Sequence, residues 1–461
     1  MTAPTLHARS RECGPAGRTA LLGGALPSGV TRARRPLRVG LFGLFGCGNT
    51  GNDGSLEAML DVVRRARPDA EILCICSARP GAAEHIAASL AVRTIPLGFV
   101  QAGSRRRRML NRALLGAPIR LASLIHAVNH LRKLDVLLVP GTGILDDFSA
   151  GPSGMPLALF VWCLAARLCG TRLAFVSIGA GPIEHPLSRK LMKAAVAMAA
   201  YRSYRDCVSR TFMEQIGFDA RSDPVYPDLA FLLPAPASER SRGGPRLTVG
   251  VGVMTYFGWR SDEGGKGAAI YAAYMDKIAA FAIWVLDQGH CLRILSGDLV
   301  DKRAVDDLTR RLANERPDCM RDRVSVATPA SLHELMRAIA ITDVVVATRF
   351  HNVVCALKLG RPTISLGYAA KNAALLTDMG LVGFDQHIER IDLGRLKQQF
   401  MRMTFDLDFY KQKICQQRQA YEQSLAEQNS LLISTFIAPD RQTAALSSSA
   451  FTLGTRRSAG T

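Results

Sequence analysis

The sequence lacks the cysteine pattern of a zinc site or of a disulfide framework. Its eleven cysteines are an odd number, none forms a Cys-x-x-Cys pair, and only Cys74 and Cys76 lie close together, inside an expected strand. His126 and His130 have the spacing of a helical metal-binding pair, but no third ligand follows near them. We therefore expect no metal site, and reduced cysteines, several of them buried, in a cytoplasmic protein.

Aromatic residues are scarce, at 7% of the chain, whereas hydrophobic residues reach 48%. This composition disfavours an all-β sandwich and is typical of layered α/β packing, and 461 residues suffice for two domains or more. No sustained apolar segment follows the arginine-rich N-terminus, so a signal peptide is not expected. The apolar run at 155–164 is shorter than the roughly 20 residues that span a bilayer.

Acidic residues are also in deficit, because 39 Asp and Glu stand against 58 Lys and Arg and leave a formal charge of +19. Part of the excess lies before residue 39, and another part at 105–112, where Arg105 to Arg108 are followed by Arg112. Such blocks are typical of a solvated surface, or of a protein that contacts nucleic acid, an anionic membrane or an anionic substrate. No nucleic-acid-binding pattern accompanies the charge, so nucleic acid is not expected as a partner. Peripheral contact of the protein with the inner face of an anionic membrane remains an alternative.

Apolar runs that end in glycine turns recur along the chain. Expected strands lie at 37–45, 71–77, 134–139, 173–178, 247–253, 291–295, 344–347 and 362–365. Segments with helical character separate or follow them, at 56–65, 271–288 and 401–436. This succession of strand, glycine turn, helix and strand predicts parallel sheets covered by helices.

A segment rich in Pro, Ser, Gly and Arg interrupts this succession near its middle. We expect a linker at 236–246, between a Rossmann-like domain at 37–235 and a second one at 247–436 that carries the C-terminal helix. By composition, 1–36 is a disordered basic tail and 437–461 a second disordered tail. The predicted fold is thus α/β, with two Rossmann-like domains facing a central cleft. Ligands of open α/β sheets bind at the carboxyl ends of strands, so the glycine turns should line that cleft.

The loop after the first strand satisfies the pattern G-x-G-x-x-G with Gly46, Gly48 and Gly51. A dinucleotide site would also need an acidic residue at the end of the second strand, where Ser77 and Arg79 stand instead. Arg79 would suit the 2′-phosphate of NADP. A tight structural turn, a loop that binds an acceptor sugar and a nucleotide loop all remain open for this segment.

Two further polar segments follow predicted strands or helices. Gly141, Thr142 and Gly143 permit close approach of a ligand, and Asp146 beyond them can accept hydrogen bonds from sugar hydroxyls or cap the next helix. Arg205 either pairs with Asp206 on a surface or faces the cleft as a fork for carboxylate or phosphate.

The strongest chemical signal is the segment 348–352, directly after a buried strand. If it is extended, Arg349 and His351 point to the same face. The arginine can then bind an anion while the histidine carries a proton near neutral pH. A core histidine beside a structural arginine is the alternative. Lys371, in the segment after the next strand, either adds positive charge to the same pocket or is solvated.

Taken together, these segments resemble the polysaccharide pyruvyltransferase family over residues 37–381. The first motif of the family corresponds to Gly48, Asn49, Gly51 and Asn52, and its glycine run to Gly141, Thr142 and Gly143 with Asp146. Its two later motifs correspond to Ser203, Arg205, Asp206 and Ser209, and to Arg349, His351, Gly360, Pro362, Tyr368 and Lys371. Asn52 stands where the family usually has Asp, and Thr142 interrupts the glycine run.

The resemblance implies a glycosyltransferase-B-like fold, with phosphoenolpyruvate as donor and a pair of sugar hydroxyls, often on a lipid-linked glycan, as acceptor. It implies that Arg205 and Arg349 bind the donor's phosphate and carboxylate, and that His351 is the general acid. The other matched positions would bind substrate, those before residue 147 on the acceptor side, and no cofactor is needed.

Three alternatives remain beside this one. A nucleotide-sugar glycosyltransferase would share the fold, an NADP-binding oxidoreductase would use the first glycine loop, and a catalytically silent scaffold at a membrane surface would use the arginine blocks.

Overall fold

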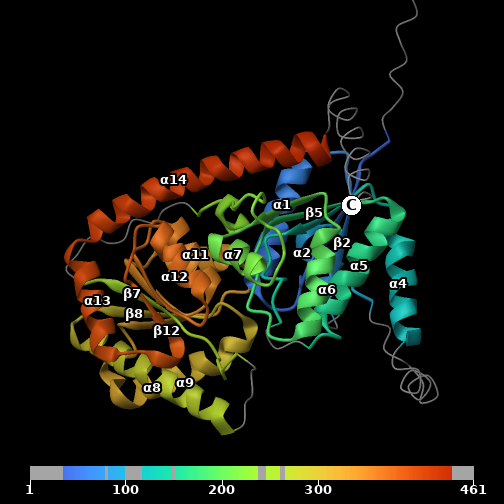
Figure 1. The fold of residues 1–461 in the computed structure, drawn as a ribbon. Helices are drawn as coiled ribbons and strands as arrows, with labels where there is room; N and C mark the ends of the chain where they lie inside the picture. Colours follow the sequence, from blue (N-terminus) through green and yellow to red (C-terminus); the bar gives the residue numbers. More distant parts are fainter. Residues whose placement is uncertain are drawn as a thin grey trace, which may run out of the picture. The chain divides into compact units, whose positions relative to one another are not determined.

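The computed structural model describes residues 35–77, 81–98, 117–147, 151–236, 246–259 and 265–438. It contains two six-stranded sheets with helices on both faces (Figure 1). Nearly all of the two predicted tails and of the predicted linker falls outside the described residues, and so do Arg79 and the arginine block at 105–112. The domain boundaries given above therefore stay a prediction.

The first sheet is parallel throughout and has the strand order β3-β2-β1-β4-β5-β6. Its strands are β1 (Arg38–Phe42), β2 (Glu71–Cys76), β3 (Arg93–Pro96), β4 (Val136–Pro140), β5 (Arg172–Ile178) and β6 (Tyr201–Tyr204). Nearly every residue of β1, β4 and β5 is buried, because helices cover both faces of a parallel sheet.

Alternate residues of these strands enter two separate cores. Val39 and Leu41 pack with α1 (Thr50–Ala66) and α2 (Ala82–Leu90). Phe42 packs on the opposite face of the sheet. That face is covered by α4 (Ala117–Leu131), α5 (Met155–Cys169) and α6 (Pro186–Ala197). Two short helices, α7 (Cys207–Gln215) and η1 (Leu229–Leu232), complete this half of the described chain.

The second sheet repeats the plan with the order β12-β11-β10-β7-β8-β9, again parallel. Numbered from its own first strand, this is the same order as in the first sheet. Its strands are β7 (Thr248–Gly252), β8 (Cys291–Leu295), β9 (Val324–Ala327), β10 (Val344–Ala347), β11 (Thr363–Gly367) and β12 (Asp385–His387). Its main helices are α8 (Gly265–Asp287), α9 (Lys302–Glu315), α10 (Leu332–Ala340), α11 (Phe350–Lys358) and α12 (Ala370–Asp378).

By length and composition alone, α8 could cross a membrane. Its Met275, Ile278, Phe281 and Val285 are nevertheless buried against the second sheet and its neighbouring helices. These contacts are those of a core helix.

The C-terminal helix predicted at 401–436 is two helices. These are α13 (Leu393–Phe405) and α14 (Leu407–Leu432), and α14 continues into a π-helical turn (Ile433–Ile437). The chain breaks at Asp406, whose carboxylate caps α14 by accepting a hydrogen bond from the Phe409 amide. From there α14 returns to the first sheet (Figure 1), where Gln428 bonds the hydroxyls of Ser177 and Ser203. The last helix therefore joins the two halves.

Candidate active site

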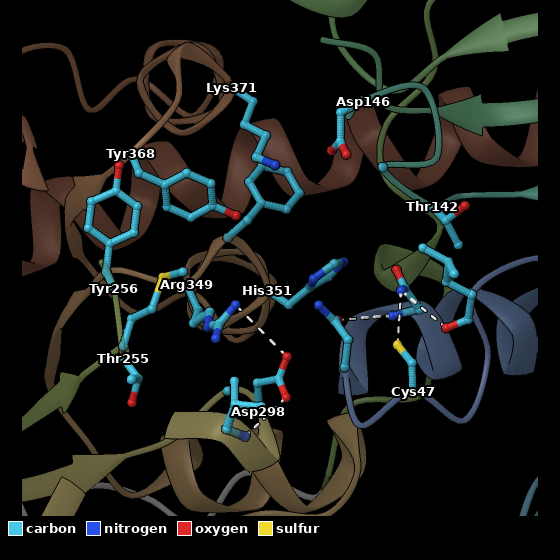
Figure 2. Close-up of a pocket in the computed structure, with 18 of the residues that line it drawn as sticks. Cys47, Thr142, Asp146, Thr255, Tyr256, Asp298, Arg349, His351, Tyr368 and Lys371 are labelled. Atoms are coloured by element: carbon cyan, nitrogen blue, oxygen red, sulfur yellow. Dashed lines mark hydrogen bonds and ion pairs between the residues drawn. The ribbon is translucent and has the colours of Figure 1, made fainter. Parts of the chain in front are cut away.

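The site lies where the strand order of each sheet reverses, at the carboxyl ends of β1 and β4 and of β7 and β10. Ligands of open α/β sheets bind at such points. A cavity of about 380 Å³ opens there. Figure 2 shows Thr142 and Asp146 on one side of it, Tyr256 and Tyr368 on the other, and His351 between them. The predicted fold, two Rossmann-like halves facing a cleft, is confirmed.

The first glycine loop holds the two halves together. Asn49 caps α1, its side chain accepting hydrogen bonds from the amides of Gly51 at 3.1 Å and Asn52 at 3.4 Å. The Thr50 hydroxyl donates to the Gly297 carbonyl at 3.0 Å across the halves. Asn49 and Asn52 line the cavity, whereas Gly48 shapes the loop with a φ of 94°.

Gly51 lies against His351 and does not itself line the cavity. A Cβ at this position would overlap the imidazole ring, so only glycine lets the ring pack on the first turn of α1. In a dinucleotide-binding protein, the pyrophosphate would lie at this helix N-terminus. Because the imidazole packs against this turn, the structure counts against the NADP alternative.

The loop after β4 contributes Thr142, Gly143 and Asp146 to the lining. Gly141 lies behind the cavity lining. The φ of Gly141 is 49°, and the Ser55 hydroxyl donates to the Gly141 carbonyl at 3.0 Å. Thr142 is buried, and its hydroxyl has no hydrogen-bond partner among the described residues. A buried hydroxyl without a partner at a cavity wall is suited to a polar ligand.

Arg205 is not a surface ion pair. Its side chain is 3% exposed, its Nη1 donates to Asp228 Oδ2 at 3.2 Å, and its guanidinium lies 4.4 Å from the centre of the Phe350 ring. Gly179 allows this packing, since a Cβ there would overlap the guanidinium. Arg205 therefore reaches the cavity as a buried, oriented cation.

Ser203 and Asp206, which share a motif with Arg205, make contacts outside the cavity. Asp206 caps α7 by accepting from the Ser209 amide at 2.6 Å, and its Oδ2 lies 3.6 Å from Arg205 Nε. Ser203 is fully buried between the Ser177 amide, at 2.8 Å, and Gln428. Neither residue lines the cavity, and both make contacts that hold the fold, so their predicted role in substrate binding stays a prediction.

Arg349 and His351 face the cavity for a reason other than the one expected. The segment is not extended: β10 ends at Ala347, Arg349 is the N-cap of α11, and His351 is its second residue. A helix begins here because this is a turn from a parallel strand into its crossover helix. The N-terminus of α11 points at the carboxyl edge of the sheet, and both side chains therefore reach the cavity.

A carboxylate orients Arg349 before any ligand arrives. Its Nε and Nη2 donate to the two oxygens of Asp301 at 2.8 and 2.7 Å, and its Nη1 lies 3.9 Å from Asp298 Oδ2. Burial by itself would lower the pKa of Arg349, but the charge and hydrogen bonds of Asp301, together with Asp298, raise it overall. The guanidinium is therefore charged and fixed, with Nη1 on the edge that Asp301 does not use.

His351 is neutral at pH 7 in the unliganded protein. Burial lowers its pKa to about 4, opposed by Asp228, whose Oδ2 lies 3.8 Å from His351 Nε2, and reinforced by the positive charges of Arg205, Lys371 and Arg349. Nε2 has no hydrogen-bond partner among the described residues. An anion bound among these cations would raise the pKa, because it would favour the protonated ring.

The wall formed by the second half contains residues that the sequence did not single out. Tyr256 stacks on Tyr368 with ring centres 5.7 Å apart, and its hydroxyl donates to Glu389 at 2.8 Å. Lys371 Nζ lies 5.3 Å from the centre of the Tyr368 ring. Thr255, Tyr256 and Trp259 follow β7, a strand without a glycine turn directly after it. Because ligands of open α/β sheets bind at the carboxyl ends of strands, the position of these residues after β7 could have marked them as site residues.

Of the fifteen residues predicted for the site, ten line the cavity. They are Asn49, Asn52, Thr142, Gly143, Asp146, Arg205, Arg349, His351, Tyr368 and Lys371. The other five, Gly48, Gly51, Gly141, Ser203 and Asp206, lie behind them. No group of three or more His, Cys, Asp or Glu side chains within the described ranges is placed to hold a metal ion.

Solved structures with the same fold have low sequence identity to the chain. The chain is similar to Anabaena HepE (Alr3699) in complex with UDP and glucose, with a TM-score of 0.54 and 14% identity. This match covers 87% of this chain and 100% of that one. A UDP-N-acetylglucosamine 2-epimerase has a TM-score of 0.55 and 14% identity, and the match covers 88% of this chain and 98% of that one. A glycosyltransferase from Rickettsia africae ESF-5 has a TM-score of 0.54 and 8% identity, and the match covers 88% of this chain and 100% of that one. The fold is thus glycosyltransferase-B-like.

The family follows from the sequence match. The model of the polysaccharide pyruvyl transferase family matches residues 49–369, from the N-cap of α1 to the turn after β11. The chain belongs to this family, and is therefore a transferase. No curated protein matches it in sequence.

Proposed function

We propose that the protein transfers the pyruvyl group of phosphoenolpyruvate to two hydroxyls of a sugar in a cell-surface glycan or exopolysaccharide, as a cyclic ketal. One observation carries this proposal. Three cations, Arg205, Arg349 and Lys371, surround a histidine with a free ring nitrogen inside one small cavity. Phosphoenolpyruvate has two anionic groups on a three-carbon frame, and this arrangement is suited to both.

The donor half of the proposal rests on the two oriented guanidinium groups. Arg205 and Arg349 are each fixed by a carboxylate, Asp228 and Asp301, that leaves other N–H groups of the fork for a ligand. Fork-shaped donors suit carboxylate and phosphate oxygens better than a point charge does. Lys371 supplies a third cation to the lining of the cavity (Figure 2).

The proposed reaction begins when C3 of phosphoenolpyruvate takes a proton from His351 and becomes a methyl group. One sugar hydroxyl adds to C2 and loses its proton, and the bond from C2 to the phosphate oxygen breaks with its electron pair leaving on phosphate. The second hydroxyl adds to C2, loses its proton and closes the ketal. One released proton restores His351 and the other leaves with phosphate. A positioned acid typically contributes about 10²–10⁴-fold.

The acceptor half of the proposal rests on the polar residues of the first half. Asn49, Asn52, Thr142 and Asp146 line the wall opposite the aromatic residues, and the hydroxyl of Thr142 has no partner of its own. Amide, hydroxyl and carboxylate groups of this kind bind sugar hydroxyls. A lipid-linked acceptor is part of the proposal.

The test is phosphate release that requires both phosphoenolpyruvate and a glycan, measured over a panel of lipid-linked and free acceptors. Arg349→Lys should weaken phosphoenolpyruvate binding by about tenfold or more, since an ammonium group cannot replace the fork. Arg202→Lys is the matched control, because Arg202 forms a similar double hydrogen bond with Asp223 outside the cavity. Sugar transfer from a nucleotide-sugar, without phosphoenolpyruvate turnover, would instead assign the chain to the glycosyltransferase alternative.

A further inference from the structure

The outer face of α4 and α5 exposes large apolar side chains to solvent. Leu121 and Ile125 of α4 are 60% and 54% exposed, and Leu168 of α5 is 64% exposed. The two helices pack side by side on the same face of the first sheet (Figure 1), where the Cys169 thiol lies 3.8 Å from the Val128 carbonyl. Leu121 and Ile125 are one turn apart on α4, and adjoining exposed apolar side chains are a feature of binding surfaces.

The sheet does not account for these side chains. Ala127 and Leu131 already fill the inner side of α4, and both are fully buried. Leu121 and Ile125 are four residues apart, so they lie on one face of the helix, the outer one. This outer face is apolar beyond what the core of the first half requires.

Basic residues lie at both ends of α4 and in the last turn of α5. Arg120, Arg132 and Lys133 are exposed, and none of them forms an ion pair with an acidic side chain in the described part of the chain. Arg167 is exposed beside Leu168. The segments of α4 and α5 contain no Asp or Glu. The stretch 85–134 has none either, against nine Arg and Lys.

We infer that this face docks on the surface of an anionic phospholipid bilayer. Apolar side chains would enter the boundary between headgroups and acyl chains while the cations contact lipid phosphates, as in interfacial amphipathic helices. A nucleic-acid surface would not require exposed leucine and isoleucine at the centre. A protein partner on this face is the other outcome that the experiment separates.

The place of this face in the fold connects it with the cavity. In a parallel sheet the crossover helix starts at the carboxyl edge, so α5 begins on the edge that carries the loop of Thr142 and Asp146. The N-terminal turns of α4, which contain Leu121, lie on the same edge. A docked face would therefore reach the edge of the cavity through Arg120 and Leu121, whereas Leu168, Arg132 and Lys133 lie toward the opposite edge of the sheet. This connection to a lipid-linked acceptor rests on the proposed function, whereas docking itself does not.

Sedimentation with vesicles tests the inference on the full-length protein. Vesicles of phosphatidylcholine alone are compared with vesicles that contain phosphatidylglycerol, at low and high salt. The wild-type chain should bind the anionic vesicles more strongly and lose that binding at high salt. Preference for neither vesicle would overturn the inference and leave a protein partner as the occupant of this face.

Two variants locate the surface. Arg120→Gln/Arg132→Gln/Lys133→Gln should weaken vesicle binding by about fivefold per charge removed, and Leu121→Ser/Ile125→Ser should weaken it independently of salt. Met401→Ser/Phe405→Ser is the matched control, because Phe405 is 93% exposed on the far half of the chain. If the α4 variants bind like wild type, or the control loses binding equally, the α4 and α5 face is not the docking surface.

A readout of activity keeps this test separate from that of the proposed function. All three variants should turn over a water-soluble acceptor at the wild-type rate, because none of the changed residues lines the cavity. An inactive wild-type protein that still binds vesicles would contradict pyruvyl transfer and leave the docking surface standing. An active protein that does not bind vesicles would contradict only the docking.

Discussion

Each arginine of the cavity is held by its own aspartate. Asp301 binds two nitrogens of Arg349, and Asp228 binds one nitrogen of Arg205. Charge-assisted bonds of this kind fix the plane of the guanidinium, so less ordering is left to the moment when a ligand binds. Asp228 also faces His351 and opposes the loss of its proton. The proposed donor site thus consists of residues from both halves.

The protonation of His351 gives a prediction for binding. Its pKa is about 4 in the free protein because of burial, and bound phosphoenolpyruvate must raise it. A higher pKa in the complex means proton uptake on binding, so His351 strengthens the affinity as the pH falls below the pKa of the complex toward about 4, and this gain is lost as the pH rises above the pKa of the complex. Calorimetry in two buffers of different ionisation enthalpy measures the uptake.

His351→Gln is the control for this linkage. The phosphate group itself titrates near pH 6 and changes its own protonation on binding in both proteins. The difference between wild type and variant therefore isolates the imidazole. Equal proton uptake in the two proteins would remove His351 from the proposed acid role.

Gly51 gives a second prediction. Alanine at a helical glycine normally favours the helix by up to about 1 kcal/mol. Gly51→Ala would instead push a methyl group into the His351 ring, so we expect turnover to fall at least tenfold with little loss of thermal stability. Gly394→Ala is the matched control, since Gly394 is also the second residue of its helix and lies outside the cavity. Wild-type turnover in Gly51→Ala would show that the ring position is not required.

The residues that bear charge were the easiest to predict for the site. Arg349, His351 and Lys371 follow strands that the apolar runs reveal, whereas Arg205 follows β6, which was not predicted. All four line the cavity. Ser203 and Asp206 share a motif with Arg205 but serve the fold, because a motif in sequence does not say which of its side chains faces inward. Asp301, which orients Arg349, comes from a different strand end and no local pattern marks it.

At the scale of elements, the sequence predicted the central strands and missed the edges. The eight predicted strands correspond to β1, β2, β4, β5, β7, β8, β10 and β11. The four that were missed, β3, β6, β9 and β12, are the edge strands of the two sheets. Edge strands are short and partly exposed, so they lack the continuous apolar run that marks a strand covered on both faces.

The return of α14 to the first half could not be predicted either, because its buried face depends on distant partners. Gln428 is fully buried and bonds the hydroxyls of Ser177 at 3.0 Å and Ser203 at 2.8 Å. Gln428→Leu should lower the free energy of unfolding by about 1–3 kcal/mol, because those hydroxyls lose a partner in the interior.

Urea denaturation measures this effect, and phosphoenolpyruvate affinity should be unchanged because Gln428 does not line the cavity. Gln419→Leu, at an exposed position of the same helix, is the control and should be nearly neutral. If both variants unfold at the same urea concentration as wild type, α14 does not anchor the first half through this residue.

At the scale of the whole described chain, two sheets with the same strand order meet at their points of reversal. Neither half alone makes the site: Arg205 and Asp228 come from the first, Arg349 and Lys371 from the second, and Gly51 of the first half positions His351 of the second. These contacts support the proposed donor site. The proposed acceptor side contains both departures from the family pattern, Asn52 and Thr142, which line the cavity, and we propose that they select the acceptor sugar.

The fate of the C2 carbon of the donor tests the central claim most directly. The protein is incubated with phosphoenolpyruvate labelled with ¹³C at C2 and with a panel of glycans, and the glycan product is analysed by NMR and mass spectrometry. We predict a labelled carbon bonded to two sugar oxygens, a mass gain of one pyruvate less one water, and one phosphate released for each ketal formed. A glycan that gains a sugar from a nucleotide-sugar, and never the label, would contradict the account.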